Sequence, residues 1–402
     1  MSQAFDFDTV INRHHSQSYK WDSNSDHNML PMFVADMDFA AAPAIIDALQ
    51  QRVAHGVFGY GWTGDEYFQA LNHWFESRYG LTINPAQVLT VIGVVPALAA
   101  IISAVAERSG NPAPGVIVQP PVYHCFYSAI RNQNARVISN PLQLDDNGIY
   151  QIDFDDLERK AAAPDTHLML LCHPHNPSGR VWSRDELQRI GEICQRHNVL
   201  LVSDEIHCDL LFPGESHVPF ATLSPDFAEH SITLNSPSKT FNLAGLQTAN
   251  IICANGPWRA AIRKMLQANE VGGIGPLGIT SLIAAYQHGA PWLAALNEYL
   301  YQNYCFIKDF LQQNLPMLEL YPQQATYLAW INCNACGLDS DQLSKRLLDD
   351  GNLRISSGNG FLPQPDPAQC YIRLNFACPR STLLEGLQRL QRIVTPLLPT
   401  QK

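Results

Sequence analysis

The sequence predicts an α/β fold with a large unit built on a mostly parallel sheet, followed by a smaller α+β unit. From about residue 43 to residue 286, short apolar segments alternate with segments of helical periodicity, as in parallel sheets whose strands are joined by helices. After residue 290 the pattern changes to a long helical stretch and then a mixture of short strands and helices. The length of 402 residues suits two such units.

The predicted strands of the large unit are apolar runs that end at a turn or a polar residue. They are Val88–Ile92, Gly115–Gln119, His167–Cys172, Val199–Ser203, Ser231–Asn235 and Ala249–Cys253. The predicted helices around them, which carry apolar residues three or four positions apart, are Ala44–His55, Tyr67–Tyr79, Ala97–Glu107, Tyr123–Gln133, Arg184–His197 and Pro276–Tyr286.

The smaller unit is predicted to contain three helices and three strands. The helices are Pro291–Asn314, Ser340–Asp350 and Ser381–Pro396, and the strands are Leu318–Leu320, Thr326–Asn332 and Tyr371–Phe376. No flexible linker marks the boundary between the units, which we place near residues 285–290.

Composition excludes several classes of function. The chain has 26 Lys and Arg against 37 Asp and Glu, a net charge of -11, which disfavours binding to nucleic acids or to anionic membranes. No apolar run approaches the ~20 residues that cross a bilayer, and the N-terminus lacks the pattern of a signal peptide. We therefore expect a cytoplasmic protein.

The ten cysteines are scattered along the chain, and without a secretory signal we expect them to be reduced thiols. The pair Cys333 and Cys336 has the spacing of a zinc ligand pair, but no second such pair exists. The His173-Pro-His175 sequence is more typical of a loop than of a ligand set. We expect no metal site.

Four segments carry the candidate chemistry, and each follows a predicted strand at the sheet edge where ligands bind in α/β proteins. In Thr90–Leu98 a strand runs through Gly93 into a helix whose first amides are free, which suits a phosphate. In Cys172–Gly179 an Asn-Pro pair followed by glycine holds the Asn176 amide in a rigid loop. Each segment alone is also compatible with an ordinary turn.

The other two segments carry charged side chains. Asp204 ends an apolar strand, and a carboxylate buried there needs a cationic partner such as a protonated ring nitrogen. A salt bridge or a helix N-cap is the alternative. Lys239 follows the hydroxyls of Ser236 and Ser238, which suits a phosphate beside a reactive amine, and the alternative is an exposed loop lysine.

In this order, the four segments resemble those of fold-type I pyridoxal-phosphate (PLP) enzymes of the class I/II aminotransferase superfamily. The chain is most similar to the MalY/PatB-type cystathionine β-lyases, or C–S lyases. The motifs that carry the resemblance are Lys20-Trp21-Asp22, Phe33–Phe39, Phe58-Gly59-Tyr60, Gly93–Leu98, Ser203–His207, Gly289–Leu293 and Arg373-Leu374-Asn375.

The resemblance covers nearly the whole chain and implies the PLP-dependent transferase fold, with a mostly parallel seven-stranded sheet. It also implies three parts of the chain. Residues 1–45 would join the small domain, residues 46–288 would form the large PLP-binding domain, and residues 289–402 would form the small C-terminal domain.

The resemblance further implies roles around the cofactor ring. Lys239 would carry PLP covalently and later move the Cα proton of the substrate. Asp204 would pair with the pyridine nitrogen and keep it protonated. Asn176 would donate a hydrogen bond to the ring hydroxyl oxygen, and Tyr123 would stack on the ring.

Other residues would hold the phosphate. By resemblance these are the backbone amides of Val94 and Val95 and the hydroxyls of Ser236 and Ser238. Tyr60 matches a tyrosine that reaches the phosphate from the neighbouring subunit, which implies a homodimer with shared active sites.

Arg373 would bind the α-carboxylate of an amino-acid substrate in a bidentate contact. Two positions depart from the wider superfamily: Gln247 stands where many aminotransferases have a phosphate-binding arginine, and His207 stands where they usually have a tyrosine. With Gln247 in place of an arginine, fewer charged side chains would hold the phosphate, so we expect weaker PLP affinity. The imidazole of His207 would still donate a hydrogen bond to the ring oxygen. Both departures agree with the lyase subgroup and favour elimination over transamination.

The resemblance thus predicts PLP-dependent β-elimination of L-cystathionine, or of other L-cysteine S-conjugates, to a thiol (homocysteine), pyruvate and ammonia. An aminotransferase that uses the same residues is the first alternative. The second is an added regulatory role through binding to a transcription factor, for which the sequence shows no interaction motif. The side chains that contact the leaving group are not identified, and Trp62, Tyr327 and the backbone at Ala35 are candidates.

Overall fold

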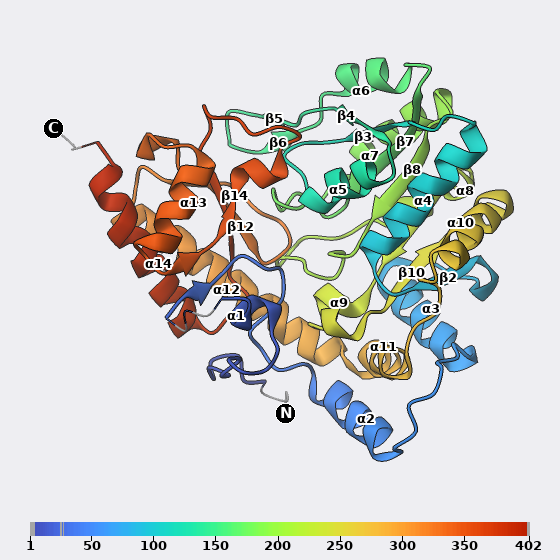
Figure 1. Ribbon diagram of the computed structural model, residues 1–402, viewed down its shortest axis with the longest axis horizontal. Coiled ribbons are helices and arrows are strands. Elements are labelled where there is room, and N and C mark those ends of the chain that lie inside the picture. Colours follow the sequence, from blue (N-terminus) through green and yellow to red (C-terminus); the bar gives the residue numbers. More distant parts are fainter. Residues whose placement is uncertain (1–4, 25, 27, 400–402) are drawn as a thin grey trace.

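A seven-stranded sheet forms the centre of the computed structural model, which describes residues 5–24, 26 and 28–399 (Figure 1). The strand order is β2-β10-β9-β8-β7-β3-β4, and β10 alone runs antiparallel to its neighbours. The prediction of a mostly parallel sheet is confirmed. Its strands are β2 (Val88–Val91), β3 (Gly115–Val118), β4 (Arg136–Ser139), β7 (Thr166–Cys172), β8 (Leu200–Asp204), β9 (Ser231–Asn235) and β10 (Ala249–Ile252).

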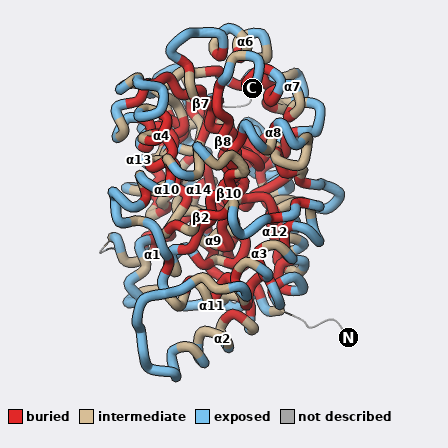
Figure 2. Tube along the Cα trace, turned by 90° about the vertical axis from the view of Figure 1, so that its right-hand side faces the viewer, coloured by how far each residue is buried: buried red, intermediate tan, exposed pale blue. Residues whose placement is uncertain are grey.

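Helices cover both faces of this sheet, so its strands are buried on both sides (Figure 2). In β7, Leu168 and Leu170 pack into the core of one face, and Met169 and Leu171 into the core of the other. This double burial explains why the strands read as continuous apolar runs. The helices are α4 (Val94–Ser109), α5 (His124–Asn132) and α10 (Gly256–Ala268) on the first face, and α6 (Phe154–Ala161), α7 (Arg184–Arg196) and α8 (Pro225–Glu229) on the second.

The smaller unit is built on a four-stranded antiparallel sheet with the order β11-β12-β15-β14. The strands are β11 (Glu319–Leu320), β12 (Leu328–Asn332), β14 (Ser356–Ser357) and β15 (Tyr371–Asn375), and the helices are α12 (Ala290–Asn314), α13 (Ser340–Asp349) and α14 (Arg380–Val394). Near the start of the chain, β1 (Leu30–Pro31) pairs in parallel with β13 (Leu353–Arg354), so the N-terminal segment with α1 (Tyr19–Asp22) lies against this unit (Figure 1).

Three further helices pack together below the central sheet: α2 (Pro43–Ala54), α3 (Asp65–Tyr79) and α11 (Pro276–His288). Gly289 alone separates α11 from α12, so no linker joins the two units. The division of the chain at residues 45 and 288 stays a prediction. The stretch between α2 and α3 is an exposed loop at the lower edge of Figure 2.

Most predicted elements exist, with ends shifted by a few residues, and the differences have local causes. Helix α4 begins at Val94, three residues before the predicted start, because Pro96 is acceptable in a first turn that needs no N–H. Strand β4, which is a partly exposed edge strand, and helices α6 and α10 were not predicted from the sequence. Neither were the hairpin of β5 (Gln143–Leu144) and β6 (Tyr150–Gln151) and the short helix α9 (Pro237–Thr240).

None of the ten cysteines forms a disulfide bond, and eight of them are buried. Within the described ranges, no helix combines the length and the apolar character needed to cross a membrane.

Candidate active site

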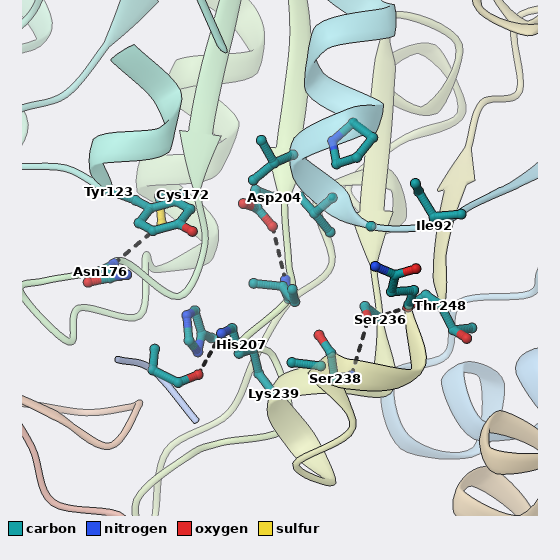
Figure 3. Close-up of a pocket in the computed structure, with 18 residues that line it drawn as sticks. Ile92, Tyr123, Cys172, Asn176, Asp204, His207, Ser236, Ser238, Lys239 and Thr248 are labelled. Carbon is teal, nitrogen blue, oxygen red and sulfur yellow. Dashed lines mark hydrogen bonds between the residues drawn. The ribbon is translucent and has the colours of Figure 1, made fainter. Parts of the chain in front are cut away.

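A cavity of about 230 Å³ opens at the carboxyl ends of the parallel strands (Figure 3). Residues that follow β2, β3, β7, β8 and β9 line it, together with Ala35 from the N-terminal segment. The cavity brings together most of the predicted site residues: Val94, Val95, Tyr123, Asn176, Asp204, His207, Ser236, Ser238 and Lys239. Tyr60 and Arg373 are not among the residues that line it.

Lys239 lies on α9, and its Nζ donates a hydrogen bond to the Ala35 carbonyl oxygen at 2.6 Å. Burial, with a smaller contribution from the Arg373 charge, lowers the pKa of this amine to about 8, although the Asp36 charge opposes the shift. A substantial fraction of Lys239 is therefore neutral near pH 8, which is the form that attacks a carbonyl carbon.

Asp204 is the last residue of β8 and is 3% exposed. Burial raises the pKa of its carboxyl group to about 7, although the Ile206 amide donates to Oδ1 at 3.3 Å and Lys239 lies near enough to oppose the shift. In the described part of the chain Asp204 forms no ion pair within 4.0 Å, so the salt bridge that was the alternative interpretation is not observed. The site has room for an external cation beside this carboxylate.

His207 also lines the cavity and is neutral, because burial lowers its pKa to about 3. Its Nδ1 is buried and has no hydrogen-bond partner among the described residues. A buried polar atom without a partner is uncommon in a folded protein. The unpartnered Nδ1 of His207 and the carboxylate of Asp204 therefore indicate that a polar ligand binds in this cavity.

The wall of the cavity includes Tyr123, which precedes α5, and Asn176, in the loop after β7. Burial raises the pKa of the Tyr123 phenol above its ordinary value, so the hydroxyl stays protonated at neutral pH. The Asn176 Oδ1 accepts a hydrogen bond from Arg373 Nη1 at 3.2 Å, which leaves its NH₂ group for another acceptor. The ring and the amide face the same cavity in Figure 3.

Arg373 lies on β15 of the smaller unit and is 3% exposed. Its Nη2 donates to the Phe33 carbonyl oxygen at 2.7 Å and to Ser356 Oγ at 3.2 Å, while its buried Nε has no partner in the described residues. Burial lowers the pKa of its guanidinium group to about 10, so it remains charged at neutral pH. Arg373 thus contacts the cavity wall through Asn176.

The phosphate-binding residues stay a prediction, and the structure shows what their polar groups contact. In the first turn of α4, which has no side-chain cap, the amides of Val94 and Val95 have no hydrogen-bond acceptor among the described residues. Ser238 lines the cavity with its hydroxyl unpaired within the described ranges. The Ser236 hydroxyl instead donates to the Thr248 carbonyl oxygen at 2.6 Å and accepts from the Ser238 amide at 3.0 Å. It caps α9, and its proton is not available to a ligand in this arrangement.

Tyr60 is fully exposed and lies in the loop between α2 and α3, away from the cavity of its own chain. Ala35, whose backbone was a candidate for contact with the leaving group, lines the cavity. Several other lining residues carry no chemical signal in the sequence and were not predicted as site residues. They are Ile92, Pro96, Cys172, Ile206, Ala244 and Thr248. Gln247 lines the cavity too, at the position where the sequence analysis noted the absence of an arginine.

The set of groups fits one kind of ligand. The free amides of α4 and Ser238 suit a phosphate, Asp204 suits a protonated ring nitrogen, and Lys239 suits an aldehyde. Fold and cavity together define the class of protein: an α/β enzyme with a reactive lysine at the carboxyl edge of its sheet.

Comparisons with known proteins identify the family. The sequence profile described as "Aminotransferase class I and II" matches residues 28–390, and the chain belongs to this family. It is 41% identical to cystathionine beta-lyase PatB of Bacillus subtilis, over 96% of this chain and 98% of that protein. It is 36% identical to protein MalY of Escherichia coli, over 96% of this chain and 98% of that protein.

Among solved structures, the chain resembles the PLP-bound C–S lyase from Staphylococcus hominis with a TM-score of 0.87 and 31% identity. The match covers 98% of this chain and 99% of that one. The resemblance inferred from the sequence motifs is confirmed.

Proposed function

We propose that this chain is a PLP-dependent C–S lyase that converts L-cystathionine and other L-cysteine S-conjugates to a thiol, pyruvate and ammonia. The observation that carries the proposal is that Lys239 and Asp204 face one cavity, where burial shifts both pKa values toward neutrality. The names and bound cofactor of the relatives support the same activity.

PLP, when bound, supplies a cationic ring that withdraws electrons from the Cα atom of an attached amino acid. Lys239 would bind the cofactor aldehyde, and its amine would then remove the Cα proton of the substrate. Asp204 would hold the proton on the ring nitrogen, since a cation in contact with this carboxylate stabilises its ionised form. Tyr123 would cover one face of the ring, and Asn176 would donate its free NH₂ group to the ring oxygen.

Arg373 would bind the substrate α-carboxylate and thereby fix the Cα–H bond relative to Lys239. The elimination breaks the Cα–H and Cβ–S bonds, the thiol leaves with a proton, and water hydrolyses the remaining three-carbon unit to pyruvate and ammonia. No keto acid is consumed, which distinguishes this reaction from transamination.

The active form is proposed to be a homodimer. Four large apolar side chains in the loop between α2 and α3 are exposed in the single chain: Val57 (62%), Phe58 (60%), Tyr60 (107%) and Trp62 (85%). A cluster of this kind is typical of a protein–protein interface, and the resemblance gives Tyr60 a place in the partner's site. Light scattering on the purified protein should give twice the chain mass of 44.8 kDa.

Absorbance and product formation test the function. The purified protein with PLP should absorb in the visible range and form pyruvate from L-cystathionine without added keto acid. Lys239→Ala should remove the visible band of the covalent cofactor and lower kcat by at least about 10³-fold. A protein that stays colourless after addition of PLP would refute the proposal, and pyruvate formation that requires a keto acid would favour an aminotransferase.

A further inference from the structure

A second cluster of polar side chains is buried on the far side of the strand end that carries Asp204. The next residue, Glu205, is fully buried, and its carboxylate accepts three hydrogen bonds. Ser203 Oγ donates at 2.9 Å, the Phe220 amide at 3.0 Å and His217 Nε2 at 3.0 Å. The side chains of Glu205 and His217 are both 0% exposed.

The loop that carries His217 also contacts the segment that leads to Asn176. The Val218 carbonyl oxygen lies 3.1 Å from His173 Nε2, and the rings of His173 and His217 lie with their centroids 4.3 Å apart and their planes 32° from parallel. Burial lowers the pKa of His173 well below its ordinary value, so this ring is neutral. Because a carbonyl oxygen only accepts, the His173 proton is on Nε2.

The backbone joins these contacts to the cavity. The His173 amide donates to the Asp204 carbonyl oxygen at 2.9 Å, and the Glu205 amide donates to the Leu234 carbonyl oxygen of β9 at 2.9 Å. Loop 217–220 therefore contacts both segments that present cofactor-binding side chains, the one before Asn176 and the one that contains Asp204.

We propose that Glu205 and His217 are positioning residues for the cofactor site: their buried pair holds the two strand-end segments that present Asp204 and Asn176. The inference rests on the proposed function, and it assigns neither residue a contact with the substrate or the cofactor. It explains why a carboxylate and an imidazole lie inside the protein directly behind the site.

A purely stabilising role is a poor explanation for this pair. Burying two ionisable groups costs desolvation energy, and well-packed apolar side chains stabilise a core at least as well. Directional hydrogen bonds hold the loop backbone at defined points, which apolar contacts do not. The Glu205 charge also contributes to raising the pKa of Asp204, after the larger effect of burial, so the pair acts on the site through charge as well.

The test compares His217→Phe with His217→Gln in the full-length protein. Phenylalanine keeps a ring against His173 but cannot donate to Glu205, whereas glutamine keeps an N–H donor. We expect His217→Phe to raise the dissociation constant of PLP, measured by titration of the cofactor-free protein, about tenfold or more. The kcat should fall by a similar factor with a smaller change in KM, because Arg373 is also held by Phe33 and Ser356, outside the two segments that this pair contacts. His217→Gln should restore most of both losses.

His197→Phe is the matched control, because it removes a second Glu–His pair that lies away from the cavity. In that pair, His197 Nε2 lies 2.5 Å from the Glu158 carboxylate, on the surface between α6 and α7. It should leave PLP affinity and kcat unchanged. If His217→Phe lowers only the melting temperature of the cofactor-free protein, while PLP affinity and kcat stay at wild-type values, the pair is merely structural and the inference is wrong.

Glu205→Gln provides a second variant in case His217→Phe does not fold. It keeps the shape of the side chain but removes the charge, and we expect PLP to dissociate at least about threefold more readily. A wild-type dissociation constant for Glu205→Gln would equally overturn the inference. Failure of the wild-type protein to bind PLP or to form pyruvate would instead refute the proposed function.

Discussion

The two sides of the active site are built in different ways. On the side of the large sheet, Asp204 ends β8 and Lys239 follows β9, so two neighbouring parallel strands bring them to one edge. On the opposite side, Arg373 comes from β15 of the smaller unit and is held by Phe33 and Ser356, from two other segments. The first side depends on the order of elements within one sheet, whereas the second depends on how three distant segments pack.

Two of the hydrogen bonds that join the two sides run from Arg373 to Asn176 and from Lys239 to Ala35. Ala35 lies in a segment whose carbonyl groups also bind Arg373 (at Phe33) and Asn375 (at Val34). In the proposed function the two sides also differ chemically: the groups proposed to bind the cofactor lie on the side of the large sheet, and the guanidinium proposed to bind the substrate comes from the smaller unit. Substitutions on the side of the large sheet should therefore change kcat and the affinity for PLP, whereas substitutions on the other side should change the KM for the amino acid.

The largest effect is expected on the side of the large sheet. Asp204→Ala removes the carboxylate that would hold the ring proton, and we expect kcat to fall about 10²–10³-fold with weaker PLP binding. Steady-state pyruvate formation at saturating PLP measures the first effect, and titration of the cofactor-free protein measures the second. Asp204→Glu keeps the charge and should retain more activity than Asp204→Ala. Equal activity of Asp204→Ala and wild type would contradict the assignment.

Arg373→Ala should act on the other side. Loss of the buried guanidinium that is proposed to bind the substrate carboxylate should raise the KM for the amino acid about 30–100-fold, with little change in the dissociation constant of PLP. Michaelis constants and cofactor titrations on the same preparation separate the two. If both constants change by the same factor, Arg373 serves the cofactor side, and the division between the sides is wrong.

A smaller effect distinguishes the two serines of the proposed phosphate site. Ser238→Ala should weaken PLP binding about tenfold, because it removes a hydroxyl that has no hydrogen-bond partner among the described residues and that would contact the phosphate. Ser236→Ala should mainly lower the free energy of unfolding, by about 1 kcal/mol, because its hydroxyl caps α9. Urea denaturation of the cofactor-free proteins and PLP titrations give the comparison. The reverse pattern would return Ser236 to the phosphate role that the sequence predicted.

The smallest effect concerns pH and links the two sides. A lysine with a lowered pKa loses its proton at lower pH than an ordinary one, so the rate of PLP capture should increase as the pH rises through about 8. Because the Arg373 charge contributes to the lowered pKa, Arg373→Ala should move the midpoint to higher pH. Stopped-flow absorbance across the pH range measures this. An unmoved midpoint would show that the guanidinium does not act on Lys239.

Sequence patterns were most reliable where a segment is buried on both faces. The strand Ser231–Asn235 has its predicted ends, β7 begins one residue before its predicted start, and β8 is shifted by one residue at each end. The edge strand Arg136–Ser139 was missed because it is partly exposed and has too short an apolar pattern, so pairing with β3 defines it. A four-residue helix such as α9 likewise has no periodicity to detect.

The large parallel sheet and the residues at its edge, including Lys239, Asp204 and Asn176, follow from local patterns along the chain, because strands that alternate with helices place their carboxyl ends together. Three contacts follow only from the packing of the folded chain: Arg373 with Asn176, Ser236 with Thr248, and Glu205 with His217. These partners lie between 12 and 197 positions apart. Whether they meet depends on how loops and units pack, which no local pattern encodes.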